Sequence, residues 1–134
     1  METTYAYLAG AIDSRGFITF GARGPSYFPR MGLSGTSPVL PNLAFANPVG
    51  IYLPPSAAQT DHWEVTNQAA REPLLRLRPY LRLKQRHADI ALEMLDLIGS
   101  QSRPISAEDL AKRVRLFEEM HRLNPDRRRR KPPG

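Results

Sequence analysis

The segment from Tyr5 to Phe20 constrains the fold of this chain more than any other part of its sequence. Its first half is rich in alanine and glycine, and Ala6 and Gly10 form an i, i+4 pair that lets a second backbone approach closely. Gly16 is expected to end this helix in the left-handed cap conformation, and residues of high β propensity follow at once. The segment therefore predicts a helix that leads directly into a strand and whose small-residue face packs against a partner helix. An ordinary amphipathic helix ending at a glycine would share these features.

Short strands and longer helices are predicted for the rest of the chain. Turn residues indicate two hairpins, and Pro29 favours an edge or a bulge in its strand because it lacks a backbone donor. Ser106 and Asp109 form a capping box that begins the last helix, which is expected to bury a stripe of five residues, Leu110, Val114, Phe117, Met120 and His121. The predicted strands cover residues 17–20, 27–34, 50–53 and 62–66, and the predicted helices cover 38–45, 67–79, 88–98 and 106–121.

Two segments of the chain match one known family. The run from Tyr7 to Phe17 resembles the signature helix of the LAGLIDADG homing endonucleases, and the run from Leu77 to Asp89 is similar to the PYL-x-LK-x-x-x-A segment of that family. The resemblance covers residues 5 to about 124. It implies an α+β fold with an α-β-β-α-β-β-α core, to which this chain adds a C-terminal helix. We expect one such domain over residues 1–124.

The resemblance also implies how the protein assembles. A chain with a single signature helix is similar to the homodimeric type of the family, in which two signature helices pack side by side. By this likeness the dimer interface would hold Ala6, Ala9, Gly10 and Asp13. In homodimeric members the lysine that matches Lys84 lies near the scissile phosphate, so Lys84 is the one candidate catalytic residue.

The signature helix departs from the family at its metal ligand. The family has an acidic residue just before the terminal glycine, and this chain has Arg15 there. Arginine stays protonated and offers only donors, so it cannot hold Mg²⁺. The family's water-organising polar residue falls at or beside Gly35, and Asp13 is assigned to local hydrogen bonding near the helix end. We therefore predict no cofactor and no metal site, with Mg²⁺ required only if the protein is an active nuclease.

Positive charge is concentrated near the carboxyl terminus. The formal net charge is +6, and residues 103–134 supply +5 of it. Residues 125–134 are predicted to be a disordered basic tail because consecutive like charges cannot be buried. Lysine and arginine side chains neutralise DNA phosphates, and strand aromatics can contact sugars or bases. The candidate DNA-binding residues are Arg15, Arg23, Tyr27, Arg30, Lys84, Arg127, Arg128, Arg129, Arg130 and Lys131.

These features favour a homodimer that binds double-stranded DNA and does not cleave it. Two alternatives stay open: an active Mg-dependent site-specific endonuclease, and a protein-interaction dimer module that no longer binds DNA. The chain has no cysteine and no apolar run of the roughly 20 residues that span a bilayer. An intracellular location, cytoplasmic or organellar, with DNA and not a membrane as partner, is therefore expected.

Overall fold

The computed structural model describes residues 2–23, 26–35, 41, 45, 50–57, 60–99 and 105–124. It has the mixed α+β architecture that the resemblance implied. The main elements are α1 (Glu2–Arg15), β1 (Phe17–Arg23), β2 (Ser26–Ser34), β3 (Ile51–Leu53), β4 (His62–Thr66), α3 (Arg71–Leu77), α4 (Gln85–Gly99) and α5 (Ala107–Leu123). Short 3-10 turns at Asn67–Ala70 and Arg78–Tyr80 flank α3.

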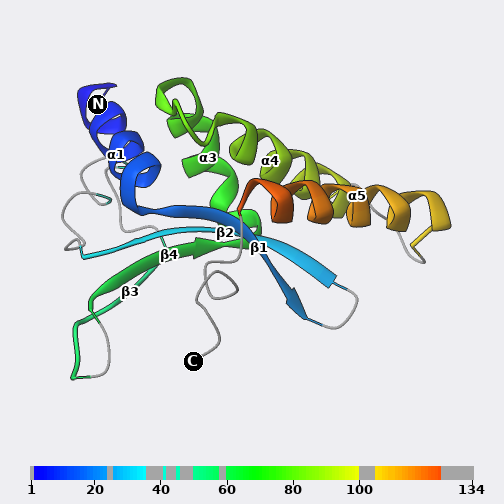
Figure 1. Ribbon diagram of the computed structural model, residues 1–134, viewed down its shortest axis with the longest axis horizontal. Helices are drawn as coiled ribbons and strands as arrows, with labels where there is room; N and C mark the ends of the chain where they lie inside the picture. Colours follow the sequence, from blue (N-terminus) through cyan, green and yellow to red (C-terminus); the bar gives the residue numbers. More distant parts are fainter. Residues whose placement is uncertain are drawn as a thin grey trace, which may run out of the picture.

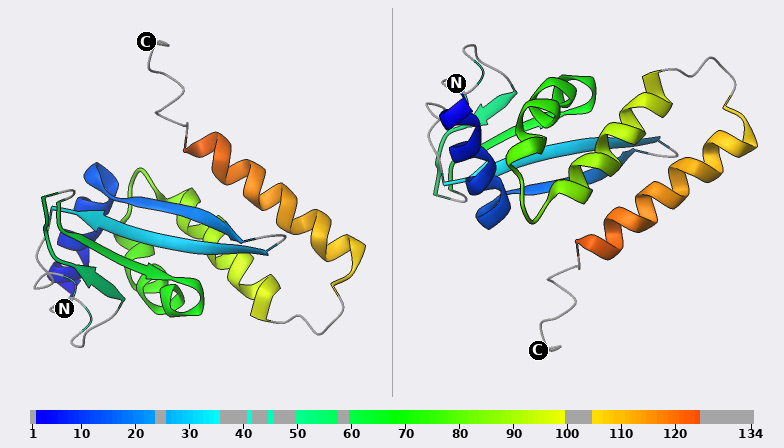
Figure 2. Two further views of the ribbon diagram at one scale, coloured as in Figure 1. Left: turned by 90° about the horizontal axis from the view of Figure 1, so that it is seen from below. Right: turned by 90° about the horizontal axis from the view of Figure 1, so that it is seen from above.

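The four strands form one antiparallel sheet in the order β1-β2-β4-β3. The helices α1, α3, α4 and α5 lie on one side of this sheet, as Figure 1 shows from the side and Figure 2 from below and above. The opposite side carries no helix among the described residues, and we call it the open face. Because side chains alternate along a strand, each strand sends every second residue to the helices and the others to the open face.

The core lies between the sheet and the helices. Burying a large apolar side chain contributes roughly 1.5–3 kcal/mol, so a continuous layer of them stabilises both surfaces that it joins. The largest fully buried side chains are Trp63, Leu8, Ile12, Ile18, Met31, Leu33, Leu74, Leu77, Ile90, Met94, Leu95 and Met120. This single cluster fixes α1, α3 and α4 over the middle of the sheet.

The junction of α1 and β1 is where predicted, but its glycine acts differently. The Gly16 amide donates to the Ile12 carbonyl at 2.9 Å, which closes the last turn of the helix. Gly16 is not among the residues with positive φ, so the expected left-handed cap was wrong. A Cβ atom at Gly16 would lie 2.6 Å from the carbonyl oxygen of Gly32 and 2.8 Å from the Ile12 Cα. Glycine is required there because the backbone of β2 and the last turn of α1 both approach this position closely.

Pro29 lies in an internal strand, yet it removes no backbone hydrogen bond between β2 and β4. It pairs with Phe20 of β1, whereas the pairing of β2 with β4 begins only at Arg30. The side of β2 that faces β4 is therefore locally an edge at Pro29, where a missing donor costs little.

The last helix begins where predicted but buries a different set of residues. The Ser106 side chain accepts a hydrogen bond from the Asp109 amide at 3.0 Å, which confirms the cap. The predicted buried stripe was wrong at both ends, because Leu110 is 42% exposed and His121 is exposed. The buried positions of α5 are Arg113, Leu116 and Met120, so the helix is rotated by about one residue from the prediction.

Two expectations concern parts of the chain that are only partly described. The predicted helix at 38–45 lies outside the described residues except for Pro41 and Phe45, which are both helical. The basic tail at 125–134 lies wholly outside them. Among the described residues, no helix has both the length and the apolar composition needed to cross a membrane.

Candidate nucleic-acid interface

A cleft of about 560 Å³ opens where α1 ends and β1 begins. It brings together segments that are far apart in the sequence: the α1–β1 junction, the loop before α4 and the end of α5. Its lining residues are Asp13, Ser14, Arg15, Gly16, Phe17, Thr19, Lys84, His87, Leu123 and Asn124. The predicted pair of Arg15 and Lys84 thus shares one cleft.

Arg15 is exposed at the last position of α1. Its Nη1 atom would lie 3.6 Å from a Cβ atom built on Gly35, so the guanidinium reaches toward the place where a side chain at position 35 would stand. Gly35 has a φ of +76°, a conformation that favours glycine, and its amide donates to the Asp61 carbonyl at 3.0 Å. The two departures from the family pattern, at positions 15 and 35, are therefore neighbours in space.

Lys84 is held in the cleft by Asp13. The Asp13 carboxylate accepts from the amides of Arg82 at 2.7 Å, Leu83 at 3.1 Å and Lys84 at 2.9 Å. The Lys84 Nζ atom in turn donates to the Asp13 carbonyl at 3.2 Å. Three successive amides just before α4 form a nest that suits an anion, and here the anion is an aspartate 70 residues away from Leu83.

The donor set of the cleft does not fit a magnesium ion. Mg²⁺ is bound through carboxylate oxygens, and both oxygens of Asp13 already accept backbone amides. Arg15 places a fixed positive charge at the position where the resemblance implies a metal ligand. No group of three or more His, Cys, Asp or Glu residues that could hold a metal occurs among the described residues.

His87 forms the buried wall of the cleft. Asn124 donates from Nδ2 to the Ile18 carbonyl at 2.8 Å, so its Oδ1 faces the His87 Nε2 at 3.0 Å and Nε2 carries the proton. The Nδ1 atom of His87 has no hydrogen-bond partner in the described part of the chain. Burial lowers the pKa of His87, the hydrogen bond that Nε2 donates to Asn124 raises it, and the charge of Lys84 lowers it again. The imidazole is therefore neutral at neutral pH.

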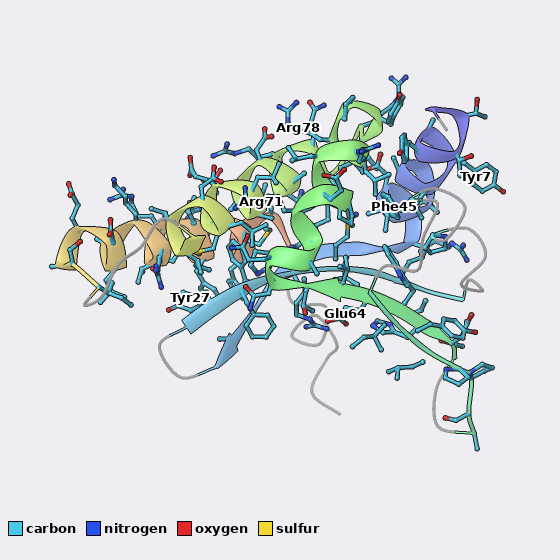
Figure 3. All side chains as sticks on the ribbon, turned by 180° about the vertical axis from the view of Figure 1, so that it is seen from behind. Tyr7, Tyr27, Phe45, Glu64, Arg71 and Arg78 are labelled. Atoms are coloured by element: carbon cyan, nitrogen blue, oxygen red, sulfur yellow. The ribbon has the colours of Figure 1, made fainter. Side chains whose placement is uncertain are left out.

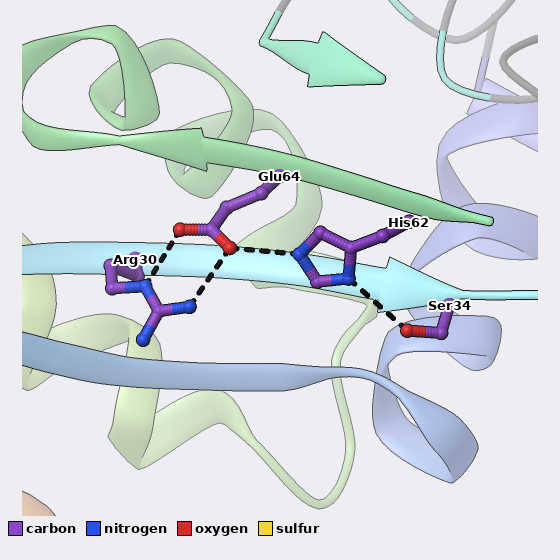
Figure 4. Close-up of polar contacts among 4 residues, drawn as sticks. All are labelled: Arg30, Ser34, His62 and Glu64. Carbon is purple, nitrogen blue, oxygen red and sulfur yellow. Dashed lines mark hydrogen bonds and ion pairs between the residues drawn. The ribbon is translucent and has the colours of Figure 1, made fainter. Parts of the chain in front are cut away.

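The open face carries a polar network that joins β2 to β4 (Figure 4). Arg30 donates to Glu64 through Nε at 2.6 Å and through Nη2 at 2.9 Å. Glu64 Oε1 also lies 2.8 Å from His62 Nε2, and His62 Nδ1 lies 3.1 Å from the Ser34 hydroxyl. The guanidinium lowers the pKa of Glu64 more than any other neighbour does, so this carboxyl is ionised at neutral pH.

Sequence reasoning missed this network, apart from naming Arg30. Its members lie four residues apart on β2, at Arg30 and Ser34, and two residues apart on β4, at His62 and Glu64, so on each strand they point to the same face. The alternation was visible in the sequence, but the register that places Glu64 opposite Gly32 was not. A side chain at Gly32 has no room, because its Cβ would lie 2.5 Å from the Trp63 carbonyl oxygen and 2.8 Å from the Phe17 ring.

The other predicted DNA-binding residues lie in different places. Tyr27 is on the face that the helices cover, where its ring stacks on Phe117 of α5 at 4.5 Å. Its contact with DNA stays a prediction, which this packing does not favour because strand alternation points the side chain toward the core. Arg23 is the last residue of β1 and pairs with Ser26. The five tail residues, 127–131, lie outside the described part of the chain.

The expected dimer face of α1 is narrower than the sequence suggested. Ala6 and Gly10 are exposed, and Tyr7 beside them is 70% exposed and projects from α1 at the margin of the molecule (Figure 3). Ala9 is fully buried within its own chain, and the Asp13 carboxylate is bound to the loop before α4. The surface free to meet a second copy is thus the i, i+4 row of Ala6 and Gly10.

Solved structures with the same fold are homing endonucleases. The homing endonuclease I-CvuI in complex with its target, in the presence of 2 mM Ca, matches with a TM-score of 0.75 and 17% identity over 94% of this chain and 85% of that chain. I-CvuI in complex with the I-CreI target, in the presence of 2 mM Mg and with the DNA not cleaved, matches with a TM-score of 0.72 and 20% identity over the same shares, 94% and 85%. No protein-family model matches the sequence, and no curated protein matches it. The likeness confirms the homing endonuclease fold for this chain.

Proposed function

We propose that this protein binds double-stranded DNA as a homodimer and does not cleave it with a metal ion. The observation that carries this proposal is the cleft at the end of α1, where Arg15 and Lys84 are present and the Asp13 carboxylate is already engaged. Such a site offers positive charge to a phosphate and no free carboxylate to a metal. The fold shared with a homing endonuclease solved in complex with its target supports DNA as the source of that phosphate.

The chemistry of the cleft suits a backbone phosphodiester. A guanidinium binds two phosphate oxygens at once, and a lysine ammonium adds a point charge. The amides of 82–84 would otherwise compete as an anion site, but Asp13 occupies them. Arg15 and Lys84 are therefore the groups of the cleft that a phosphate can reach.

The open face of the sheet is the surface on which we place the duplex. Its charge is low, because Arg30 is neutralised by Glu64 through two hydrogen bonds. Phosphate neutralisation supplies most non-specific affinity, so a face of this kind adds little of it. The basic residues 127–131 then supply the salt-sensitive part of binding, as the sequence predicted.

Dimerisation through Ala6 and Gly10 would place two such open faces side by side on one duplex. The two residues are exposed, and a Cβ at Gly10 would meet no heavy atom within 4 Å in its own chain. No described residue of the protomer therefore fills the space beside Gly10, which the small side chains leave as a groove on α1. A second signature helix fits that groove, because small residues at i and i+4 allow close approach of two helices.

The decisive test measures binding and nicking in the same samples. The purified protein is incubated with supercoiled plasmid in Mg²⁺ or in Mn²⁺, and gel shifts are recorded beside nicking. We expect a shift without strand breaks, and a weaker shift for Arg15→Ala and for Lys84→Ala. Arg71→Ala is the matched control, because Arg71 pairs with Asp96 on the helical layer and does not line the cleft.

Two results would contradict the proposal in different ways. Metal-dependent nicking by the wild type, lost in Lys84→Ala or Asp13→Asn, would replace it with the endonuclease alternative. Absence of any shift at low salt would favour the protein-interaction alternative, which the low charge of the open face supports. Arg15→Asp adds a third comparison: a carboxylate at this position is expected to lower DNA affinity, because it replaces the attraction of a phosphate with repulsion.

A further inference from the structure

The Arg30–Glu64 pair uses two of the five N–H donors of the guanidinium and leaves three. Glu64 takes the Nε hydrogen and one hydrogen of Nη2, which together form the side edge of the group. An arginine has five N–H donors in a rigid plane, so three remain, two on Nη1 and one on Nη2. The Nη1 and Nη2 hydrogens of the end edge form a second fork that points away from Glu64 (Figure 4).

This second fork is held rigidly. The Arg30 guanidinium carbon lies 5.2 Å from the centre of the Phe17 ring, and the Phe17 ring stacks on His62 at 5.9 Å with planes 10° apart. His62 donates from Nε2 to the Glu64 carboxylate, so its Nδ1 accepts from the Ser34 hydroxyl. Every member of the network is thus tied to a neighbour on β1, β2 or β4.

The two side chains of the pair differ in exposure. The Glu64 side chain is 19% exposed and the Arg30 side chain is 36% exposed, so the carboxylate lies deeper in the face and the guanidinium nearer its surface. The three remaining N–H groups are therefore accessible to a ligand that lies on the open face. An arginine fixed in this way loses little conformational entropy when it binds, which is the condition for a specific contact.

We propose that Arg30 reads a guanine in the major groove of the bound duplex and that Glu64 is its positioning residue. The proposal rests on the DNA-binding function proposed above. Guanine presents two acceptors, O6 and N7, side by side in the major groove, and a fork of two N–H donors matches them. Adenine offers a donor in place of O6, and the pyrimidines present no such pair of acceptors.

The network favours a base over a phosphate as the ligand of Arg30. A phosphate contact depends on net positive charge, and Glu64 cancels the charge of Arg30 at hydrogen-bond distance. A base contact depends on the direction of the donors, and Glu64 and Phe17 fix that direction. Glu64 is therefore unfavourable for simple attraction to DNA and favourable for reading its sequence.

The pairing of Glu64 with Arg30 also argues against a hydrolytic role for Ser34. Ser34, His62 and Glu64 stand in the order hydroxyl, imidazole, carboxylate, as in a nucleophilic relay. Both Glu64 oxygens accept from Arg30, so the carboxylate is already compensated and stabilises a charged imidazole less. The geometry of Glu64 is that of a carboxylate that positions Arg30.

The experiment selects bound duplexes from a library with a randomised central segment and sequences them. For the wild type we expect a guanine at one fixed position of each half-site. For Arg30→Met, which keeps an unbranched side chain without donors, we expect the preference for that guanine to fall about 5- to 150-fold. Affinity for random duplex should fall less, by the repulsion of the Glu64 charge that Arg30 no longer cancels. Glu64→Gln should reduce the preference in the same direction and to a smaller extent.

A modified base tests the contact itself. Replacing the selected guanine by 7-deazaguanine removes the N7 acceptor, and we expect wild-type affinity to fall about 10-fold while Arg30→Met is unaffected. Arg86 and Glu119 provide the matched control, because they form the same bidentate pair at 2.7 Å and 2.9 Å between α4 and α5, away from the open face. Arg86→Met and Glu119→Gln should leave the selected sequence unchanged.

The contrary outcomes are separable. If the wild type selects no duplex because it does not bind DNA, the proposed function and this inference fail together. If it binds and Arg30→Met lowers affinity equally for all sequences, Arg30 is a phosphate contact and only this inference fails. An unchanged selected motif in Arg30→Met, with thermal unfolding like that of the wild type, would also refute it.

Discussion

Replacing Asp13 with alanine tests whether this carboxylate is a structural anchor or a spare metal ligand. The change removes the acceptor of three backbone amides at 2.7, 3.1 and 2.9 Å. A hydrogen bond to a charged acceptor contributes about 1.5–3 kcal/mol when its loss leaves the donor buried. Arg82 and Leu83 are exposed, so water replaces much of the loss, and we expect a total cost of about 2–4 kcal/mol.

The assay is thermal and urea unfolding of the wild type and its variants. For a chain of this length each kcal/mol corresponds to roughly 3 °C, so Asp13→Ala should lower Tm by roughly 6–12 °C. The matched control is Asp96→Ala, since Asp96 makes one ion pair to Arg71 with a side chain that is 71% exposed, and such pairs contribute about 0–1 kcal/mol.

A second readout connects stability to the cleft. Because the Lys84 amide and ammonium group both bind Asp13, we expect Asp13→Ala to weaken DNA binding as well as folding. The reasoning is refuted if Asp13→Ala and Asp96→Ala lower the free energy of unfolding equally. It is also refuted if Asp13→Ala has the stability of the wild type and loses only metal affinity.

Three further outcomes are expected. Gly10→Leu should weaken dimerisation in sedimentation by about 1–3 kcal/mol without unfolding the protomer, because a Cβ there meets nothing within 4 Å; a wild type that is monomeric at micromolar concentration would contradict this. Deleting residues 127–134 should flatten the salt dependence of DNA affinity by a slope of up to about 4, and an unchanged slope would exclude the tail as a DNA arm. The pKa of His87 is lowered by burial, so the unfolded chain binds this proton more readily. Its share of stability is then complete above the unfolded pKa of about 6.5 and is lost as pH falls from there toward the folded pKa. The urea midpoint should therefore depend less on pH between 7 and 5 in His87→Gln, and equal pH dependence would contradict the assignment.

Local features of the fold were readable from the sequence because they depend on neighbouring residues. The helix that ends before Gly16, the hairpin of β3 and β4, and the cap at Ser106 follow from propensity, turn residues and capping, which act over a few positions. The family resemblance added the order of elements. Even so, the reason for Gly16 was not local: the carbonyl of Gly32 on the next strand excludes a side chain there.

The site was decided by contacts between distant segments. Arg15 and Lys84 each lie in a segment that resembles the family, but only the fold brings them into one cleft. The fold also lets the Asp13 carboxylate accept hydrogen bonds from the amides before α4. Strand register turned Tyr27 inward. Register also joined Arg30 to Glu64, 34 residues later in the chain. Such pairs have no local signal, because a shift of one residue would send every side chain of a strand to the other face, and packing against the core selects between the two.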